Sequence, residues 1–291
     1  MEAYVLVVIA AVIAAIAYSY LRQFSFSLVA SATCGAVFLF MLIDAGTRGI
    51  IYSRAIVEFG FRPEDLIDPS RFYTVLTSMF THASFGHLFM NVIALAFLGM
   101  ILEQRIGTRQ YILIFLFAGV CGTLSFAAFR WNEPFVLVVG ASGAISGVLG
   151  ALVRMYPHER MTLIFFPRMP LPLWTIICGF LLLQLVMLIG DYGVAVEAHL
   201  GGLVAGMFAA PYFAKAQVLR REKRTIPVTA LRKLATTHEL KAMLARIENE
   251  EIPDVRSAWI EKFVSVARCP VCGAALKTRK AGLFCDRGHL L

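Results

Sequence analysis

Seven apolar segments limit what this chain of 291 residues can fold into. They lie near residues 3–20, 27–44, 86–102, 108–129, 141–156, 171–190 and 194–213. A helix needs about 20 mostly apolar residues to cross the hydrocarbon core of a bilayer. Hydrophobic residues make up 59% of the chain and charged residues 16%, whereas soluble domains have about 45–50% and about 25%. The sequence therefore predicts an all-α polytopic membrane protein.

Charge is unevenly distributed and predicts the orientation in the membrane. Residues 1–213 hold 11 basic and 11 acidic residues. The net charge of +8 therefore comes from residues 214–291, which hold 16 basic and 8 acidic residues. Basic residues gather on the cytoplasmic side of membrane proteins, and the run at 220–224 follows the last apolar segment directly. We expect an integral multi-pass protein, most simply of the cell membrane, with its N-terminus outside and its C-terminus in the cytoplasm. Nucleic-acid binding is the alternative reading of this charge, and it is not expected.

Two further segments complete the membrane part of the chain. The first apolar segment carries Glu2 and no basic residue before its apolar run, unlike a signal peptide, so we read it as a retained helix. Residues 45–80 are too long for a hairpin and too hydrophobic for a solvated linker. They are predicted to form an amphipathic structure at the outer membrane surface.

Two polar residues in apolar segments point to chemistry inside the membrane. Ser142 lies in Gly140-Ala141-Ser142-Gly143, and His199 lies in a later apolar segment. Polar groups within a bilayer are costly and are functional candidates by default, and a serine becomes a nucleophile when a base takes its proton. The first turn of a helix beginning at Ser142 also leaves backbone N–H groups free to stabilise an oxyanion.

Small residues near both side chains favour close contact between the two helices. Gly143 follows Ser142, and Gly202 and Gly206 follow His199 at +3 and +7, on about the same helix face. Small residues at such spacing let membrane helices approach closely. Taken alone, Gly-Ala-Ser-Gly is more often a packing motif than a catalytic one, and the paired histidine favours catalysis.

A second polar group precedes these segments. His87 and Asn91 stand at i and i+4, hence on one helix face. Their side-chain N–H groups could complete an oxyanion site with the Ser142 amide, although both could instead join neighbouring helices. His82, near the outer surface, is expected to be structural.

These residues together resemble the rhomboid family of intramembrane serine proteases. The motifs are His82-x4-His87-x3-Asn91, Leu102-Glu103-x3-Gly107, Gly140-Ala-Ser142-Gly143 and Ala-His199-x2-Gly202-x3-Gly206, in that order. The resemblance covers about residues 27–213. It implies a six-helix core with Ser142 as nucleophile, His199 as general base, and His87, Asn91 and the Ser142 amide as the oxyanion site. It also implies that the substrates are transmembrane segments of single-span or other membrane proteins, and that catalysis needs no cofactor.

Two positions depart from the family pattern. A frequent Trp-Arg pair of the outer loop is replaced by Tyr73-Thr74, and an aromatic residue often found four positions after the nucleophile is Ser146. The departures leave open how the loop is anchored and how the His199 ring is held. A catalytically silent relative that binds membrane clients is the alternative function. A transporter or channel is a third possible function, but such a protein would not need the glycine-flanked serine.

The C-terminal cysteines predict a metal site. Cys269-Pro-Val-Cys272 is followed, after twelve intervening residues, by Cys285-x3-His289, a Cys₃His pattern typical of structural zinc. It resembles a short zinc ribbon, which would serve a cytoplasmic partner that the sequence does not name. A redox-sensitive cysteine pair is the alternative.

These observations predict four parts of the chain. Residues 1–23 form an additional N-terminal transmembrane helix, and residues 24–213 form the rhomboid-like six-helix core. Residues 214–264 form a small, basic, amphipathic helical linker, with apolar residues at helical spacing over 228–250 and 255–264. Residues 265–291 form the zinc ribbon.

Overall fold

The structure is a computed structural model that describes residues 3–46, 53–133, 135–162, 170–222, 226, 228–250, 253–279 and 282–289. The chain divides into two compact units, Met1–Gln217 and Val218–Leu291. The predicted basic run at 220–224 lies outside the residues whose side chains are described, as do Ile50 and Ile51 of the predicted amphipathic segment.

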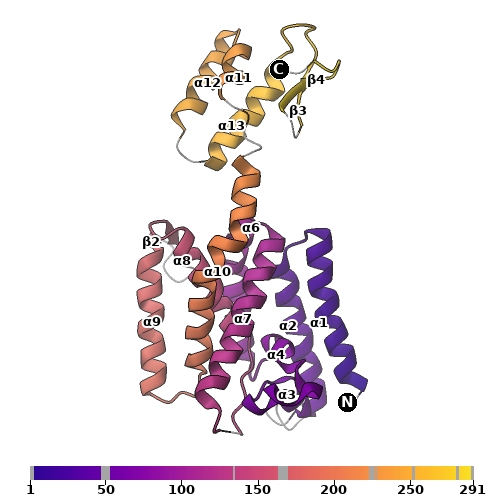
Figure 1. Cartoon of the computed structure of the whole chain (residues 1–291), viewed down its shortest axis with the longest axis vertical. Coiled ribbons are helices and arrows are strands. Elements are labelled where there is room, and N and C mark those ends of the chain that lie inside the picture. Colours follow the sequence, from indigo (N-terminus) through magenta and orange to yellow (C-terminus); the bar gives the residue numbers. More distant parts are fainter. Residues whose placement is uncertain are drawn as a thin grey trace. The chain divides into compact units, whose positions relative to one another are not determined.

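The first unit is a bundle of apolar helices that run alongside one another (Figure 1). Four described helices are long and apolar enough to cross a membrane: α1 (Ala3–Arg22), α2 (Phe26–Ala45), the run Phe85–Ile106, and α7 (Thr108–Arg130). The run Phe85–Ile106 comprises α5 (Phe85–Ala94), a π-helical turn η6 (Leu95–Gly99) and α6 (Met100–Ile106). Three further helices follow: α8 (Ser142–Met155), α9 (Leu173–Ile189) and α10 (Val196–Glu222). The all-α polytopic membrane fold is confirmed.

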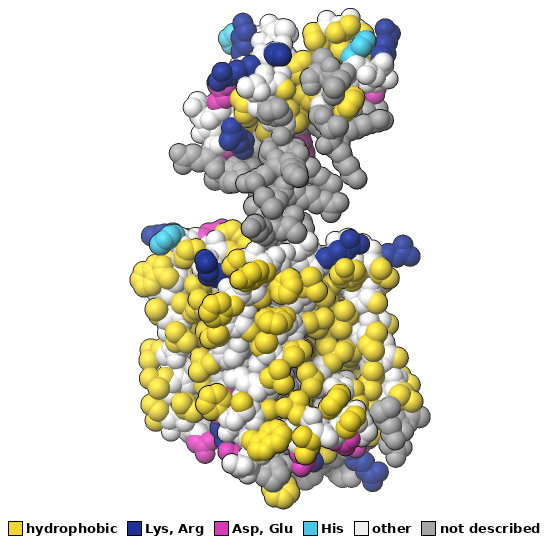
Figure 2. All heavy atoms as spheres, viewed as in Figure 1, with side chains coloured by type: hydrophobic (Ala, Val, Ile, Leu, Met, Phe, Trp, Pro, Cys, Tyr) yellow, Lys and Arg dark blue, Asp and Glu magenta, His cyan; other side chains and the backbone are white. Residues whose placement is uncertain are grey.

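The surface of this unit has the pattern of a membrane protein. Figure 2 shows one of its faces, where hydrophobic side chains cover the middle and charged side chains gather at the two ends. Exposed large apolar residues are especially frequent on α9, whose described residues include only two buried side chains, Leu173 and Gln184. Lipid tails can cover such residues at no cost in hydrophobic free energy.

Helix α8 is short and lies inside the bundle. Its 14 residues span about 21 Å at 1.5 Å per residue, less than the membrane core. Its residues from Gly143 to Val153 are buried, and α7 forms its most extensive helix contact. Ser142, the first residue of this buried helix, is itself half-buried.

Between α2 and α5, the described residues from Ser53 to Ser84 form five short helices. They are α3 (Arg54–Phe59), η3 (Pro63–Leu66), η4 (Pro69–Arg71), α4 (Thr74–Thr77) and η5 (Ser78–Phe80). This connecting segment is hydrogen-bonded to the chain before Ser142: Phe61 and Val138 exchange two backbone bonds, and Gly140 N–H donates to Ser78 O at 2.8 Å. Its predicted place at the membrane surface stays a prediction.

One carboxylate holds the start of α2 against α6. Glu103 is buried and accepts hydrogen bonds from Ser25 Oγ at 2.9 Å, from the Phe26 N–H at 2.6 Å and from the Ser27 N–H at 3.0 Å. The first N–H groups of a helix lack partners within it, and a carboxylate at this end is also favoured by the helix dipole. Gly107, four residues on, ends α6 at a φ of +85°, a conformation that favours glycine.

A short hairpin between α8 and α9 was not expected from the sequence. Strand β1 (Arg160–Thr162) pairs antiparallel with β2 (Pro170–Pro172), with Met161 opposite Leu171. Proline lacks the N–H that a helix interior needs, so Pro170 and Pro172 place the start of the next helix at Leu173. The predicted segment 171–190 is therefore the helix Leu173–Ile189.

In the second unit, the described residues form three helices and a hairpin: α11 (Val228–Leu234), α12 (His238–Asn249), α13 (Pro253–Val266), β3 (Leu276–Arg279) and β4 (Gly282–Cys285). The helical spacing over 228–250 is interrupted between Leu234 and His238. The cause is Thr237, whose hydroxyl accepts a hydrogen bond from the Leu240 N–H at 3.2 Å and so caps the start of α12. Residues of all five elements share one apolar core, among them Leu231, Leu240, Phe263, Leu276 and Leu283.

Candidate active site and candidate metal site

The predicted nucleophile and base lie in hydrogen-bond contact. Ser142 is the first residue of α8, and His199 lies in the first turn of α10. The His199 Nε2 atom is 2.8 Å from Ser142 Oγ, and the other ring nitrogen, Nδ1, is 2.8 Å from Gln184 Oε1. A serine–imidazole contact of about 2.6–3.2 Å is what proton transfer requires.

Glycine contacts bring α8 and α10 close together. A Cβ atom on Gly202 would clash with Gly143 O, and one on Gly206 would clash with Gly147 O. The carbonyl of Ala198, next to His199, lies 3.4 Å from where a Gly143 Cβ would stand. These glycines therefore permit the helix approach that the Ser142–His199 contact needs.

The His87 ring lies beside Ser142. A Cβ atom on Gly140 would be 2.5 Å from His87 Nε2 and 3.6 Å from Ser142 Oγ. His87 also packs edge-on against the fully buried His82, with ring centroids 5.0 Å apart. His82 thus supports the ring of His87, and its own ring nitrogens are buried without a hydrogen-bond partner among the described residues.

Asn91 is buried, and its side-chain amide makes one hydrogen bond within its own helix. Its Nδ2 atom donates to the carbonyl of His87 at 2.8 Å, while its Oδ1 atom is buried without a hydrogen-bond partner. An amide nitrogen carries two N–H groups, so one of them remains for another acceptor. The oxyanion role predicted for Asn91 stays a prediction.

Among the described residues, the hydrogen-bond partners of the His199 ring are Ser142 and Gln184, and neither is a carboxylate that could act as a third catalytic member. Glu197, two residues earlier on α10, instead forms an ion pair with Arg130 at 2.8 Å. The partner that the sequence analysis missed is Gln184 on α9. The sequence does mark Gln184 as a candidate functional residue, because an amide within an otherwise apolar spanning helix is costly. Its hydrogen-bond partner could not be predicted, because that depends on how α9 packs against the other helices.

Comparison with known proteins identifies the family of the chain. The family model "Rhomboid domain" matches residues 69–216, just over half of the chain. The chain belongs to the rhomboid family.

Several rhomboid relatives are similar to part of this chain. The Rhomboid protease GluP of Bacillus subtilis is 31% identical over 179 residues, which cover 60% of this chain and 32% of the relative. Rhomboid protein 1, mitochondrial, of Saccharomyces cerevisiae is 29% identical over 157 residues, covering 52% and 44%. The Presenilin-associated rhomboid-like protein of Bos taurus is 30% identical over 145 residues, covering 47% and 37%. The matched part thus spans less than half the length of each of these relatives.

Both departures from the rhomboid pattern have a structural counterpart. Where the loop has Tyr73-Thr74, Arg71 binds Asp65, Glu58, Tyr73 and the carbonyl of Val57, at distances of 2.8 to 3.2 Å. Ser146, in the place of the aromatic residue, donates to Ser142 O at 2.7 Å. The ring that borders His199 comes from Phe180 on α9, with centroids 6.5 Å apart.

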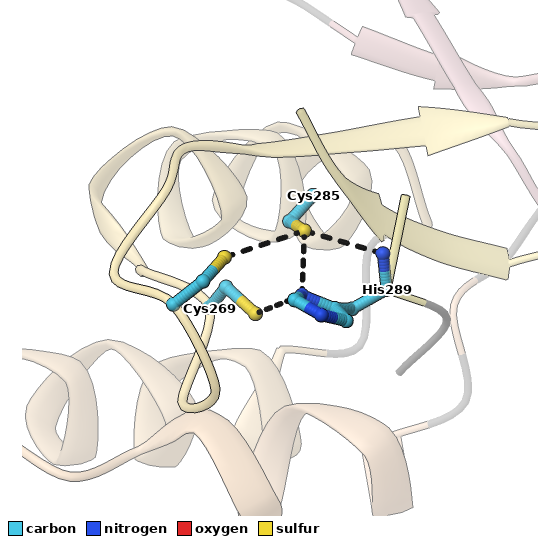
Figure 3. A group of neighbouring side chains, drawn as sticks. Cys269, Cys285 and His289 are labelled. Atoms are coloured by element: carbon cyan, nitrogen blue, oxygen red, sulfur yellow. Dashed lines mark hydrogen bonds between the residues drawn. The ribbon is translucent and has the colours of Figure 1, made fainter. Parts of the chain in front are cut away.

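The four predicted metal ligands gather in the second unit. The Sγ atoms of Cys269, Cys272 and Cys285 and a ring nitrogen of His289 all lie within 4.8 Å of one another, and this cluster could bind a metal ion. Figure 3 shows Cys269, Cys285 and His289 pointing toward a common centre. Two tight turns present these side chains, and each contains a glycine in the left-handed region, Gly273 at φ +70° and Gly288 at φ +88°.

The spacing of these atoms fits tetrahedral coordination. Zinc–sulfur bonds of about 2.3 Å and zinc–nitrogen bonds of about 2.0–2.1 Å place two sulfurs about 3.8 Å apart and a sulfur and a nitrogen about 3.5 Å apart. The Cys272 Sγ–Cys285 Sγ distance is 3.6 Å, and His289 Nδ1 lies 3.7 Å from Cys269 Sγ and 3.3 Å from Cys285 Sγ.

The surroundings of Cys285 favour its thiolate form. Although burial raises the pKa of the Cys285 thiol, backbone hydrogen bonds of His289 and Arg287 lower it, and the pKa falls to about 6. The His289 N–H donates to Cys285 Sγ at 3.3 Å. The thiolate is the form of cysteine that binds metals.

Proposed function

We propose that this rhomboid family member is an intramembrane serine endopeptidase that cleaves transmembrane segments of other membrane proteins through a dyad of Ser142 and His199. The observation that carries the proposal is the 2.8 Å contact between Ser142 Oγ and His199 Nε2, on two helices of a bundle of apolar helices. Relatives named as proteases support it.

The reaction begins when Ser142 Oγ attacks the scissile carbonyl carbon while His199 Nε2 accepts the hydroxyl proton. The imidazolium then gives this proton to the leaving amine, and an acyl-enzyme remains on Ser142. Water, deprotonated by the same nitrogen, then adds to the acyl carbon. The bond between this carbon and Ser142 Oγ breaks, Oγ regains its proton from the imidazolium, and the acid product leaves. No metal or organic cofactor is required in this sequence.

Donors for the developing oxyanion come from three places. Ser142 is the first residue of α8, so its backbone N–H lacks a partner within the helix. The ring of His87 borders the same space, and the free N–H of Asn91 is the third donor. We expect the loss of one such donor to lower kcat by about 10²–10³-fold.

The orientation proposed for the chain places its N-terminus outside and its C-terminus in the cytoplasm, as the basic residues predict. The dyad then opens toward the outer face of the membrane, and substrate segments approach it from the surrounding bilayer. The closely related alternative, a silent family member that binds clients, has no specific use for a serine hydroxyl bonded to an imidazole.

The test is reconstitution of the full chain in lipid vesicles with a single-span reporter protein. We expect wild type to cleave the reporter within its membrane segment, and Ser142→Ala and His199→Ala to abolish cleavage. Ser125→Ala, a change on α7, provides a serine control that keeps activity. Cleavage that survives in both dyad variants would exclude the dyad.

For the second unit, we propose that Cys269, Cys272, Cys285 and His289 bind a structural Zn²⁺ ion. The support is the mixed sulfur and nitrogen donor set at tetrahedral spacing. A zinc ribbon of this kind would present a surface to a cytoplasmic partner. Metal analysis of the purified full chain is expected to find about one zinc per chain, and a chain without bound zinc would contradict this part of the proposal.

A further inference from the structure

Gln184 contacts His199 on the side opposite to Ser142. Both ring nitrogens of His199 are therefore engaged, Nε2 by Ser142 Oγ and Nδ1 by Gln184 Oε1, each at 2.8 Å. The three side chains come from three different helices, α8, α9 and α10.

The chemistry of an amide oxygen decides which nitrogen carries the proton. A carbonyl oxygen only accepts hydrogen bonds, and a neutral imidazole has one donor and one acceptor nitrogen. Nδ1 of His199 must therefore donate to Gln184 Oε1, which leaves Nε2 without a proton. This is the tautomer that can accept the hydroxyl proton of Ser142.

Burial shows that the amide is held in this contact. Gln184 is 5% exposed, and among the described residues of α9 it shares burial only with Leu173. Burying an amide without a partner costs about 1–3 kcal/mol. The contact of Gln184 Oε1 with His199 Nδ1 offsets that cost.

A second residue of α9 borders the same ring. Phe180 lies one helical turn before Gln184, and its ring centroid is 6.5 Å from that of His199 at an interplanar angle of 45°. The i and i+4 spacing places both side chains on one helix face. Two side chains of α9 thus restrict the His199 ring: Phe180 limits its tilt, and Gln184 limits its rotation.

We propose that Gln184 is a positioning residue for catalysis: it holds the His199 ring in the orientation and tautomer that accept the Ser142 proton. The inference rests on the proposed peptidase function and deepens it. A merely structural hydrogen bond between α9 and α10 is the competing role, and the two differ in their effect on kcat.

The test compares Gln184→Met and Gln184→Glu in the full chain, reconstituted with a single-span reporter. Methionine keeps the length of the side chain and removes the strong acceptor, whereas glutamate keeps an acceptor oxygen and removes every donor. The matched control is Leu185→Met, on an exposed position of the same helix. Each variant is assayed for kcat, for KM, for the rate at which a fluorophosphonate probe labels Ser142, and for its thermal midpoint.

We expect Gln184→Met to lower kcat about tenfold, the effect of one neutral hydrogen bond on a rate, with KM unchanged. Labelling of Ser142 should slow in the same ratio, and Gln184→Glu and Leu185→Met should stay close to wild type. A kcat of Gln184→Met within about twofold of wild type would overturn the inference, as would equal losses in Gln184→Met and Gln184→Glu. Wild type that neither cleaves the reporter nor takes up the probe would instead refute the proposed function, and this inference with it.

Discussion

Gly140 and His87 lie so close together that the backbone at Gly140 leaves no room for a side chain. A Cβ atom there would stand 2.5 Å from His87 Nε2, and the φ of Gly140 is +113°. Side chains other than hydrogen are strained in this conformation. The chain thus turns into α8 beside the His87 ring, two residues before Ser142.

We expect Gly140→Ala to abolish or strongly reduce peptide cleavage. The added methyl group must displace His87 or the Ser142 backbone, and the φ adds strain of about 1–3 kcal/mol. Reporter cleavage and the thermal midpoint are measured together. The control is Gly86→Ala, because nothing lies within 4 Å of a Cβ atom at Gly86; this helical position should keep activity and gain slightly in stability. Full activity in Gly140→Ala would contradict the assigned contact.

The approach of α8 and α10 supplies a second prediction. Gly206→Ala places a methyl group against the carbonyl of Gly147, so the helices must separate or the backbone must shift, at a cost of about 1–3 kcal/mol. Activity and thermal midpoint should fall together, since the same contact positions His199 against Ser142. Gly179→Ala on α9, where a Cβ atom meets nothing within 4 Å, is the matched control. Unchanged stability in Gly206→Ala would argue against the close packing.

Arg71 is expected to anchor the segment between α2 and α5. Its guanidinium binds Asp65, Glu58 and the carbonyl of Val57 at once. Lysine cannot reproduce this fork of donors, so Arg71→Lys should lower the unfolding free energy by about 1–3 kcal/mol. Hydrogen exchange over residues 53–84 should accelerate. Arg62→Lys is the control, since its pair with the half-exposed Glu64 at 3.4 Å should contribute less than about 1 kcal/mol.

The helices of the membrane unit could be predicted from the sequence because each is encoded locally. Runs of apolar residues mark them, and their ends fall within a few residues of Arg22, Ala45 and Arg130. The Ser142–His199 pair could also be predicted from the sequence, since a polar side chain within an apolar segment is conspicuous and the apolar segments contain few other polar residues that could be its partner.

Contacts that depend on packing could not be predicted in the same way. Gln184 was visible as an amide in an apolar segment, but its bond to His199 requires the rotation of α9 about its own axis. The role of Arg71 depends on the folding of a segment without helical periodicity. The break before His238 rests on one capping hydroxyl, Thr237, within an otherwise continuous helical pattern.

Removal of the metal is expected to loosen the end of the chain. The proposed ligands lie on two turns flanking β3 and β4, and a small hairpin with a bound ion gains much of its folding free energy from the metal. A chelator should therefore speed trypsin cleavage within residues 265–289, as read by mass spectrometry, and leave reporter cleavage by the membrane unit unchanged. Cys285→Ser should behave like the chelated wild type. Cys178→Ser, at an exposed cysteine of α9, should behave like the untreated protein, and equal protease sensitivity of all forms would exclude a stabilising metal.

The carboxylate of Glu103 provides the last prediction. Its two oxygens accept three hydrogen bonds at the start of α2, including the N–H groups of Phe26 and Ser27. Glu103→Gln replaces one acceptor by an amide nitrogen that faces donors, so at least one buried bond is lost, at a cost of about 1–3 kcal/mol. The thermal midpoint in detergent should fall, while kcat of the remaining folded protein stays near that of wild type because Ser25 and its neighbours do not contact Ser142 or His199. The control is Glu133→Gln, whose partly exposed pair with Arg130 at 3.1 Å is expected to contribute less than about 1 kcal/mol. An unchanged midpoint in Glu103→Gln would show that α2 is held in place by its apolar contacts alone.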